Sequence, residues 1–144
     1  MSVKTCYTKL MTTSSYLQSI SLLLARLAVA YGFLDPVLTK WKNIEGVASW
    51  FDTLGIPLPT LNAYLAASTE TLGVLLLSLG FLTRLISLPL IVVMGVAILT
   101  VHLPHGFAAG ENGFEIPLYY LLFLLLFLSH GAGKISLDYL WIRK

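Results

Sequence analysis

Four long apolar stretches constrain the fold of this chain more than any other feature of its sequence. They cover residues 17–34, 61–82, 85–103 and 115–131. A bilayer core is about 30 Å thick, so a helix needs roughly 20 mainly apolar residues to cross it. In lipid, backbone amides must be satisfied within their own segment, and such runs therefore become helices. The sequence predicts an all-α membrane protein built as a bundle of four transmembrane helices.

The composition supports this prediction. Of the 144 residues, 57% are hydrophobic and 11% are charged, whereas soluble globular domains carry about 25% charged residues. The length suits a single membrane domain that covers residues 1–144. The net charge of +2 is small and forms no basic stripe, so nucleic acid is not an expected partner. The lipid bilayer is the expected surrounding.

The first apolar stretch also has features of a signal peptide, because lysines precede it and Ala28-Val29-Ala30 offers a cleavage site. Arg26 lies inside the run, however, and three further spans follow it. The stretch is therefore expected to remain as an uncleaved first helix. The single cysteine, Cys6, precedes this helix and can form neither an intramolecular disulfide nor a dithiol pair.

Positive charges set the expected orientation, because they gather on the cytoplasmic side of a membrane protein. One side of the predicted spans holds six of them: Lys4, Lys9, Arg84, Lys134, Arg143 and Lys144. The other side holds Lys40 and Lys42. This split predicts a multi-pass protein of a bacterial cytoplasmic (inner) membrane, with both termini in the cytoplasm.

The first outer loop, residues 35–60, is predicted to contain a short helix over about residues 42–54. Apolar residues recur there at helical spacing, with polar residues on the opposite face. This pattern is typical of an amphipathic helix that lies at the membrane interface. Gly55 is expected to end the helix, and Thr60 is the expected N-cap of the second span.

Two ionisable residues lie inside predicted spans, where charged side chains are costly and usually pair. Arg26 is eight residues from the outer end of the first span, and Glu70 is nine from the outer end of the second. Both therefore lie roughly 12–14 Å below the outer boundary. A buried Arg26–Glu70 ion pair follows as a hypothesis. Either the pair only holds two helices together, or Glu70 also exchanges protons with a bound molecule.

Further polar side chains converge on the same outer end of the bundle. A cluster of Arg, Glu, His, Lys and Tyr there is a candidate site for a polar head group, such as a quinone ring or a small anion. On this interpretation Glu70 and Arg26 are the candidate catalytic residues. The candidate cofactor-binding residues are Tyr31, Lys40, His102, Glu115 and Tyr119. For His102, a simple hydrogen bond to a neighbour is the alternative.

Familiar redox centres are not expected in this chain. No two histidines fall at one depth on different spans, as a bis-histidine haem requires. His102 and His105, without a nearby Cys or Met, do not make a metal site. A glycine-rich phosphate loop and a nucleophile elbow are also missing. Electron chemistry would need a diffusible cofactor, with a quinone as the candidate, or a protein partner that supplies electrons.

Several short pieces of the sequence form a pattern by their order and spacing. They are Arg26, Gly32, Lys40, Glu70-Thr-Leu-Gly73, Gly80-Phe-Leu-Thr-Arg84, His102, Asn112-Gly-Phe-Glu115 and Gly133-Lys-Ile-Ser-Leu-Asp138. With these pieces, about residues 22–138 resemble the DoxX family of small bacterial and archaeal membrane proteins. At Asp35-Pro36 the chain departs from the family pattern, in which a more apolar continuation is expected.

The resemblance implies a four-helix bundle and a range of roles. Some family members are membrane subunits of a thiosulfate:quinone oxidoreductase, and others are linked to membrane redox complexes that handle oxidative or thiol stress. A shared fold does not transfer an activity by itself.

Three functions therefore stay open. The first is a redox subunit that binds a quinone, with Arg26 and Glu70 handling its oxygens and protons. The second is a non-catalytic membrane anchor or assembly factor, whose interfacial helix and tail, residues 135–144, contact a partner. The third is a small-solute transporter, ranked last because four spans are few and no broken helix pair marks a site. A homo-oligomer would make transport more plausible.

Overall fold

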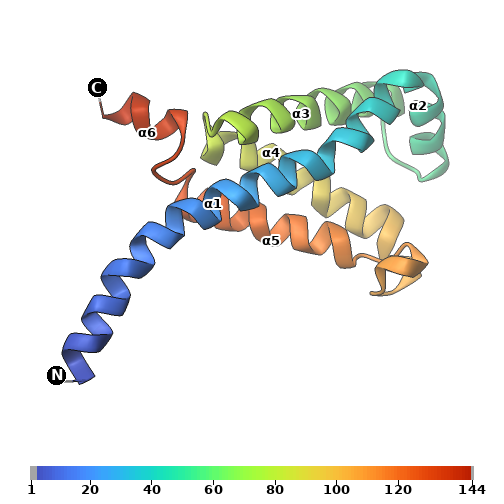
Figure 1. The fold of residues 1–144 in the computed structure, drawn as a ribbon. Coiled ribbons are helices and arrows are strands. Elements are labelled where there is room, and N and C mark those ends of the chain that lie inside the picture. Colours follow the sequence, from blue (N-terminus) through green and yellow to red (C-terminus); the bar gives the residue numbers. More distant parts are fainter. Residues whose placement is uncertain (1–2, 144) are drawn as a thin grey trace.

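The computed structural model describes the backbone of residues 3–143, and the side chains of residues 14 and 17–143. Within this range the chain is helical and contains no strand, which confirms the all-α class (Figure 1). The helices are α1 (Val3–Lys42), α2 (Ile44–Thr53), α3 (Pro59–Leu79), α4 (Thr83–Ala97), α5 (Glu115–His130) and α6 (Leu137–Ile142). The side chains of Lys4, Cys6 and Lys9, and all of Lys144, lie outside the described part.

The four long helices pack side by side. Helix α1 contacts α3 and α5, and α4 contacts the same two helices from the other side. Figure 1 shows α2 and the loop before α5 at one end of this bundle, with α6 and the α3–α4 turn at the opposite end. The first part of α1 extends beyond the other helices (Figure 1).

The first helix is longer than predicted. We expected it to end at residue 34, but it continues through Asp35 and Pro36 to Lys42. Proline removes one backbone donor from a helix, and membrane helices tolerate this loss because neighbouring groups satisfy the freed carbonyl. Residues 35–42 therefore belong to the helix rather than to the outer loop. This difference carries Lys40 and Trp41 onto a face that packs against α3.

The predicted loop helix is present as α2. The side chain of Asn43 caps it by accepting a hydrogen bond from the Gly46 amide at 3.0 Å. Gly55 follows the helix with a φ of 72°, as its expected role as a terminator requires. The expected N-cap at Thr60 is wrong, because α3 begins at Pro59 after Leu58. Proline suits the first helical position because its φ is preset and no amide there needs a cap.

In the part of the chain that the structure describes, two helical segments are long and apolar enough to cross a membrane, namely Leu17–Lys42 and Thr83–His105. The second combines α4 with a π-helical turn (Ile98–His102) and a 3₁₀ turn (Leu103–His105). Only 33% and 22% of the residues in their most apolar windows are buried. Most of their apolar side chains therefore face outward, unlike those of a helix in a soluble core. Helix α5 is apolar but shorter.

The core lies where the four long helices face one another. It contains Val29 and Phe33 of α1, Leu77 of α3, Leu90 of α4 and Phe127 of α5, all at most 1% exposed. These large side chains interdigitate in a small volume, so the loss of one would leave a cavity. The core therefore fixes the positions of the helices that carry the polar residues.

The small residues of α3 serve as a packing surface, as their spacing suggests. Gly73 is buried, and a Cβ atom at this position would lie 2.9 Å from Cδ1 of Leu90. Helices α3 and α4 can approach closely only because this side chain is absent. Ala67 and Glu70 are buried on the same face of α3, so Glu70 faces the interior of the bundle.

The described cations separate between the two ends of the bundle, as the orientation argument requires. Arg84 and Lys134 line one cleft together with Tyr139, whose ring Arg143 covers. Lys42, by contrast, ends α1 beside α2 at the opposite end. The assignment of the Arg84 end to the cytoplasm stays a prediction.

Candidate functional site

Arg26 is fully buried, and its guanidinium joins three parts of the chain. Nη1 donates to the carbonyl oxygen of Leu77 at 2.9 Å, and Nη2 donates to that of Ile135 at 2.7 Å. The carboxylate of Asp138 interacts with it electrostatically. Arg26 therefore fastens α1 to the last turns of α3 and to the segment that precedes α6.

Asp138 caps a helix that is distant from it in the sequence. Its Oδ1 accepts from the Leu82 amide at 2.7 Å, and its Oδ2 accepts from the Thr83 amide at 3.0 Å. Helix α4 begins here without a side-chain cap of its own. A carboxylate at a helix N-terminus satisfies unpaired amides and interacts favourably with the helix dipole. The C-terminal segment thus stabilises the start of α4.

Gly80 makes this arrangement of Arg26 and Asp138 possible. Its φ is 65°, a conformation that residues with a side chain adopt at a cost. A Cβ atom there would also overlap the guanidinium of Arg26 and lie 2.7 Å from Cβ of Ser136. The carbonyl of Gly80 accepts from the Asp138 amide at 2.9 Å. Both the backbone angle and the space at this position therefore require glycine.

The expected ion pair between Arg26 and Glu70 is wrong, because Glu70 pairs with Lys40. Lys40 Nζ lies 2.8 Å from Oε2 and 3.1 Å from Oε1 of Glu70. The depth estimate failed because α1 continues beyond residue 34 and brings Lys40 alongside α3. Arg26 instead bonds to Leu77, which is about 10 Å further along α3 than Glu70. The catalytic roles of Arg26 and Glu70 stay predictions.

The Lys40–Glu70 pair is buried on one side and accessible on the other. The side chain of Glu70 is 3% exposed, and that of Lys40 is 18% exposed. An ammonium group has three donor hydrogens, and hydrogen bonds to the two carboxylate oxygens leave one for another acceptor. Burying such a pair costs several kcal/mol of solvation for each ion. Inside a membrane helix, ionisable groups of this kind commonly mark functional sites.

Aromatic side chains lie beside the ion pair. Nε1 of Trp41 donates to Oγ1 of Thr71 at 2.9 Å, and Thr71 donates in turn to the Ala67 carbonyl at 2.7 Å. The rings of Trp41 and Tyr64 meet edge to face, with centroids 6.1 Å apart. We call these residues the Lys40–Glu70 site: Lys40, Trp41, Tyr64, Glu70 and Thr71.

A cleft of about 470 Å³ adjoins this site between α2 and the start of α3. Tyr64 lines the cleft and also contacts Trp41, so it belongs to both. The polar lining on the α2 side includes Glu45, Ser49 and Asp52. The Lys40–Glu70 site therefore has an open cleft next to it on the side of Tyr64.

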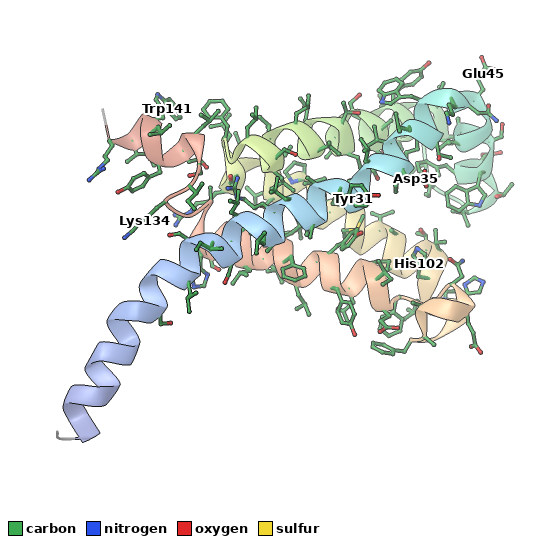
Figure 2. The ribbon with its side chains drawn as sticks, in the orientation of Figure 1. Tyr31, Asp35, Glu45, His102, Lys134 and Trp141 are labelled. Atoms are coloured by element: carbon green, nitrogen blue, oxygen red, sulfur yellow. The ribbon has the colours of Figure 1, made fainter. Side chains whose placement is uncertain are left out.

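The remaining predicted cofactor-binding residues do not join the Lys40–Glu70 site. His102 makes a hydrogen bond to the Asn112 carbonyl at 2.8 Å, which agrees with the simple alternative for this residue. Glu115 accepts from the Ala109 amide and from the Tyr119 hydroxyl, each at 3.0 Å. These bonds fold the loop before α5, and Figure 2 shows His102 at that end of the bundle.

Tyr31 also lies apart from the Lys40–Glu70 site. Its side chain is 79% exposed, so it faces outward from α1 rather than into a shared vestibule. Of the five predicted cofactor-binding residues, the structure brings Lys40 alone to Glu70. The sequence did not identify Trp41, Tyr64 and Thr71 as residues of this site. The spacing of Tyr64 and Thr71 offered a signal, because residues seven apart share one helix face.

Comparison with known proteins gives a family and three relatives. The DoxX family model matches residues 21–103. An uncharacterized protein of Haemophilus influenzae is 34% identical over 123 residues, which cover 83% of this chain and 82% of the relative. Inner membrane protein YphA of Escherichia coli is 34% identical over 125 residues, with coverage of 83% and 89%.

The third relative is a protein of Bacillus subtilis named "Putative oxidoreductase CatD". It is 32% identical over 120 residues, which cover 83% of this chain and 85% of the relative. No solved structure matches the chain. The region matched by the family contains Arg26, Lys40 and Glu70, whereas Asp138 lies beyond it.

Replacement of Gly80 by alanine should destabilise the protein more than the same change at Gly55. Both glycines have positive φ angles, but a Cβ atom at Gly55 meets nothing within 4 Å. Gly55→Ala should therefore cost about 1 kcal/mol for the backbone conformation. Gly80→Ala should cost a further ~2 kcal/mol because the new methyl group displaces Arg26. Unfolding followed by circular dichroism in detergent measures both; equal losses would contradict the proposed crowding.

A double-mutant cycle should assign the partner of Glu70. Combining Lys40→Met with Glu70→Gln should give a coupling free energy of about 1–3 kcal/mol, because the two side chains are in direct contact. Arg26→Lys combined with Glu70→Gln should be additive within about 0.5 kcal/mol, since these residues share no partner. The same unfolding measurement gives all values. A larger coupling for Arg26 than for Lys40 would restore the original pairing hypothesis.

Proposed function

This chain belongs to the DoxX family, and from that premise we propose that it is an inner-membrane subunit of a quinone-linked redox system, with the Lys40–Glu70 site as its polar centre. The names of two relatives, "Inner membrane protein YphA" and "Putative oxidoreductase CatD", support the proposed location and the proposed class of reaction. The buried pair of Lys40 and Glu70 carries the proposal for the site.

The proposed topology has four crossings, made by α1, α3, the Thr83–His105 segment and α5. Helix α3 has 21 residues, and α5 has 16, which correspond to about 32 Å and 24 Å of helix. Exposed leucines on these helices would face lipid. Both termini would lie in the cytoplasm, with α2 at the outer interface.

The residues of the Lys40–Glu70 site fit a quinone ring by their chemistry. A quinone has a flat ring that suits aromatic contacts and two carbonyl oxygens that accept hydrogen bonds. Trp41 and Tyr64 provide aromatic surface, and Lys40 provides a donor at a partly exposed position. Small-molecule sites commonly combine an apolar lining with a few placed polar groups. The set of donors and rings therefore matches this ligand class.

When bound, a quinone accepts two electrons and two protons and becomes a quinol. Glu70 holds the ammonium group of Lys40 in place through both carboxylate oxygens. Lys40 donates a hydrogen bond to the ligand, and the Glu70 carboxylate can bind and release a proton where little water reaches it. The electrons come from a partner protein, of a class such as a flavoprotein or a thiol- or sulfur-oxidising enzyme.

Arg26 has a different task in this proposal from the catalytic one that its sequence position suggested. Its guanidinium donates hydrogen bonds to the backbone carbonyls of Leu77 and Ile135. It is fully buried, and its partner Leu77 lies about 10 Å along α3 from Glu70. We therefore assign to Arg26 the role of positioning α1. Lys40 is assigned the hydrogen bond to the ligand, and Glu70 the binding and release of a proton.

A quinone-binding titration tests this proposal directly. The chain has three tryptophans, and the Trp50→Phe/Trp141→Phe background leaves Trp41 as the reporter. A short-chain ubiquinone or menaquinone analogue should quench its fluorescence to saturation in nanodiscs. Lys40→Met should weaken binding by about tenfold or more, because it removes a charged hydrogen-bond donor.

Glu115→Gln is the matched control, since Glu115 is a carboxylate at the same end of the bundle but in the loop before α5. This variant should keep the affinity of the background protein. Quenching that never saturates, or equal affinity in Lys40→Met, would overturn the proposed site. A loss in Glu115→Gln alone would move the site to the loop.

One observation favours the second function, that of a membrane anchor or assembly factor. Helix α6 exposes Leu140, Trp141 and Ile142, the last at 82%, and such a cluster can contact a partner. In this case Leu140→Ser/Trp141→Ser would abolish co-purification of the partner from native membranes. Lys40→Met would leave co-purification intact. If the redox function is correct, the Lys40→Met variant should still co-purify with the partner but should no longer support quinone reduction.

A further inference from the structure

A second cleft opens at the end of the bundle opposite α2. Its volume is about 690 Å³, and it lies between α1, the start of α4, the turn that follows α5, and α6. Figure 2 labels Lys134 and Trp141 at this end. None of the five residues of the Lys40–Glu70 site lines this cleft.

Two cationic side chains, Arg84 and Lys134, belong to the polar lining of this cleft, together with neutral polar residues. Arg84 and Lys134 are exposed there, and His130 stands beside them. Nη2 of Arg84 donates to the Ser129 carbonyl at 3.1 Å, which uses one of the five donors of a guanidinium. The group therefore retains donors and its full charge for an anion in the cleft.

Asp138, which also lines the cleft, is bound by backbone amides of the protein itself. It is the acidic residue in the lining, and both of its oxygens already accept hydrogen bonds from backbone amides of α4. It also faces the buried guanidinium of Arg26. Its negative charge is thus engaged within the protein, while Arg84 and Lys134 stand at the surface.

The lining also includes apolar side chains that are open to the surroundings. Leu85, Trp141 and Ile142 are 61%, 62% and 82% exposed, respectively. An amphipathic molecule with a negative head and an apolar tail would contact both kinds of lining. A free inorganic anion would leave the apolar side chains uncovered.

The cleft also lies at the depth where a lipid headgroup would be found. Helix α4 begins at this cleft and helix α5 ends there, so the cleft lies at the boundary of two proposed membrane crossings. Basic pockets between membrane helices bind anionic lipid headgroups, and each nearby Lys or Arg contributes about 1 kcal/mol to such binding. Trp141 suits the same depth, because indole rings favour the interface.

We propose that this cleft binds one anionic phospholipid, with its phosphate between Arg84 and Lys134 and its acyl chains along Leu85 and Trp141. This site is independent of the quinone proposal and requires only that the chain lie in a bilayer. The bound lipid would bridge α1, α4 and α6, and would reinforce the contacts that Arg26 and Asp138 make beneath it.

Native mass spectrometry of the full chain, released from detergent, tests the proposal. Titration with dioleoyl phosphatidylglycerol should give one retained lipid per chain, and dioleoyl phosphatidylcholine, with the same tails, should bind much more weakly. Arg84→Gln/Lys134→Gln should weaken phosphatidylglycerol binding by about 30-fold, the effect of two lost cationic contacts. Lys42→Gln removes a cation from the opposite end of the bundle and should leave binding unchanged.

Arg84→Lys separates loss of binding from loss of folding, because it keeps the charge while changing the hydrogen bond to Ser129. It should retain most of the affinity for phosphatidylglycerol. Glycerophosphoglycerol, a headgroup without tails, and inorganic phosphate should not compete at the same concentrations. Equal binding of phosphatidylcholine, full competition by phosphate, or an equal loss in Lys42→Gln would each overturn the proposal.

Discussion

The buried guanidinium of Arg26 is the interaction on which the rest of this structure depends. A charged group in an apolar interior must find polar partners or the fold does not form. Arg26 takes them from the Leu77 and Ile135 carbonyls, and so fixes α1 against two distant segments. Gly80 has no side chain and so leaves space for the guanidinium. Asp138, which follows Ile135 by three residues, caps α4. One side chain therefore sets the packing of this end of the bundle.

The second charged pair lies further along the same two helices. Lys40 follows Arg26 by fourteen residues on α1, about 21 Å of helix, and Glu70 precedes Leu77 by seven residues on α3, about 10 Å. The two clusters then differ in what they can do. Arg26 donates to neutral backbone carbonyls that neither titrate nor move far. Lys40 and Glu70 are charged side chains, and Lys40 is partly exposed, so the second cluster is the one that we propose to contact a ligand.

The sequence predicts the helices well because each depends on a local pattern. Apolar runs locate α3, α4 and α5, and the amphipathic spacing locates α2 within two residues at its start. The partner of Glu70 depends instead on the register between two helices, which a continuous α1 through Pro36 decides. The cap on α4 comes from Asp138, more than fifty residues away. A local pattern carries no information about such contacts, so the sequence identified Glu70 and Lys40 as candidates but paired Glu70 with the wrong cation.

The place of Glu70 along α3 bears on the ligand class that we propose for the Lys40–Glu70 site. Glu70 is the twelfth residue of α3, about 16 Å along the helix from Pro59. A small hydrophilic anion would have to shed its hydration to reach that level, at a cost of many kcal/mol for an ion in a medium of low dielectric constant. A quinone ring carries no net charge and is soluble in the apolar layer, so it can arrive laterally and meet Lys40 at its exposed edge. On the proposed topology, this argument supports our proposal of a lipid-soluble carrier rather than an ion at the Lys40–Glu70 site.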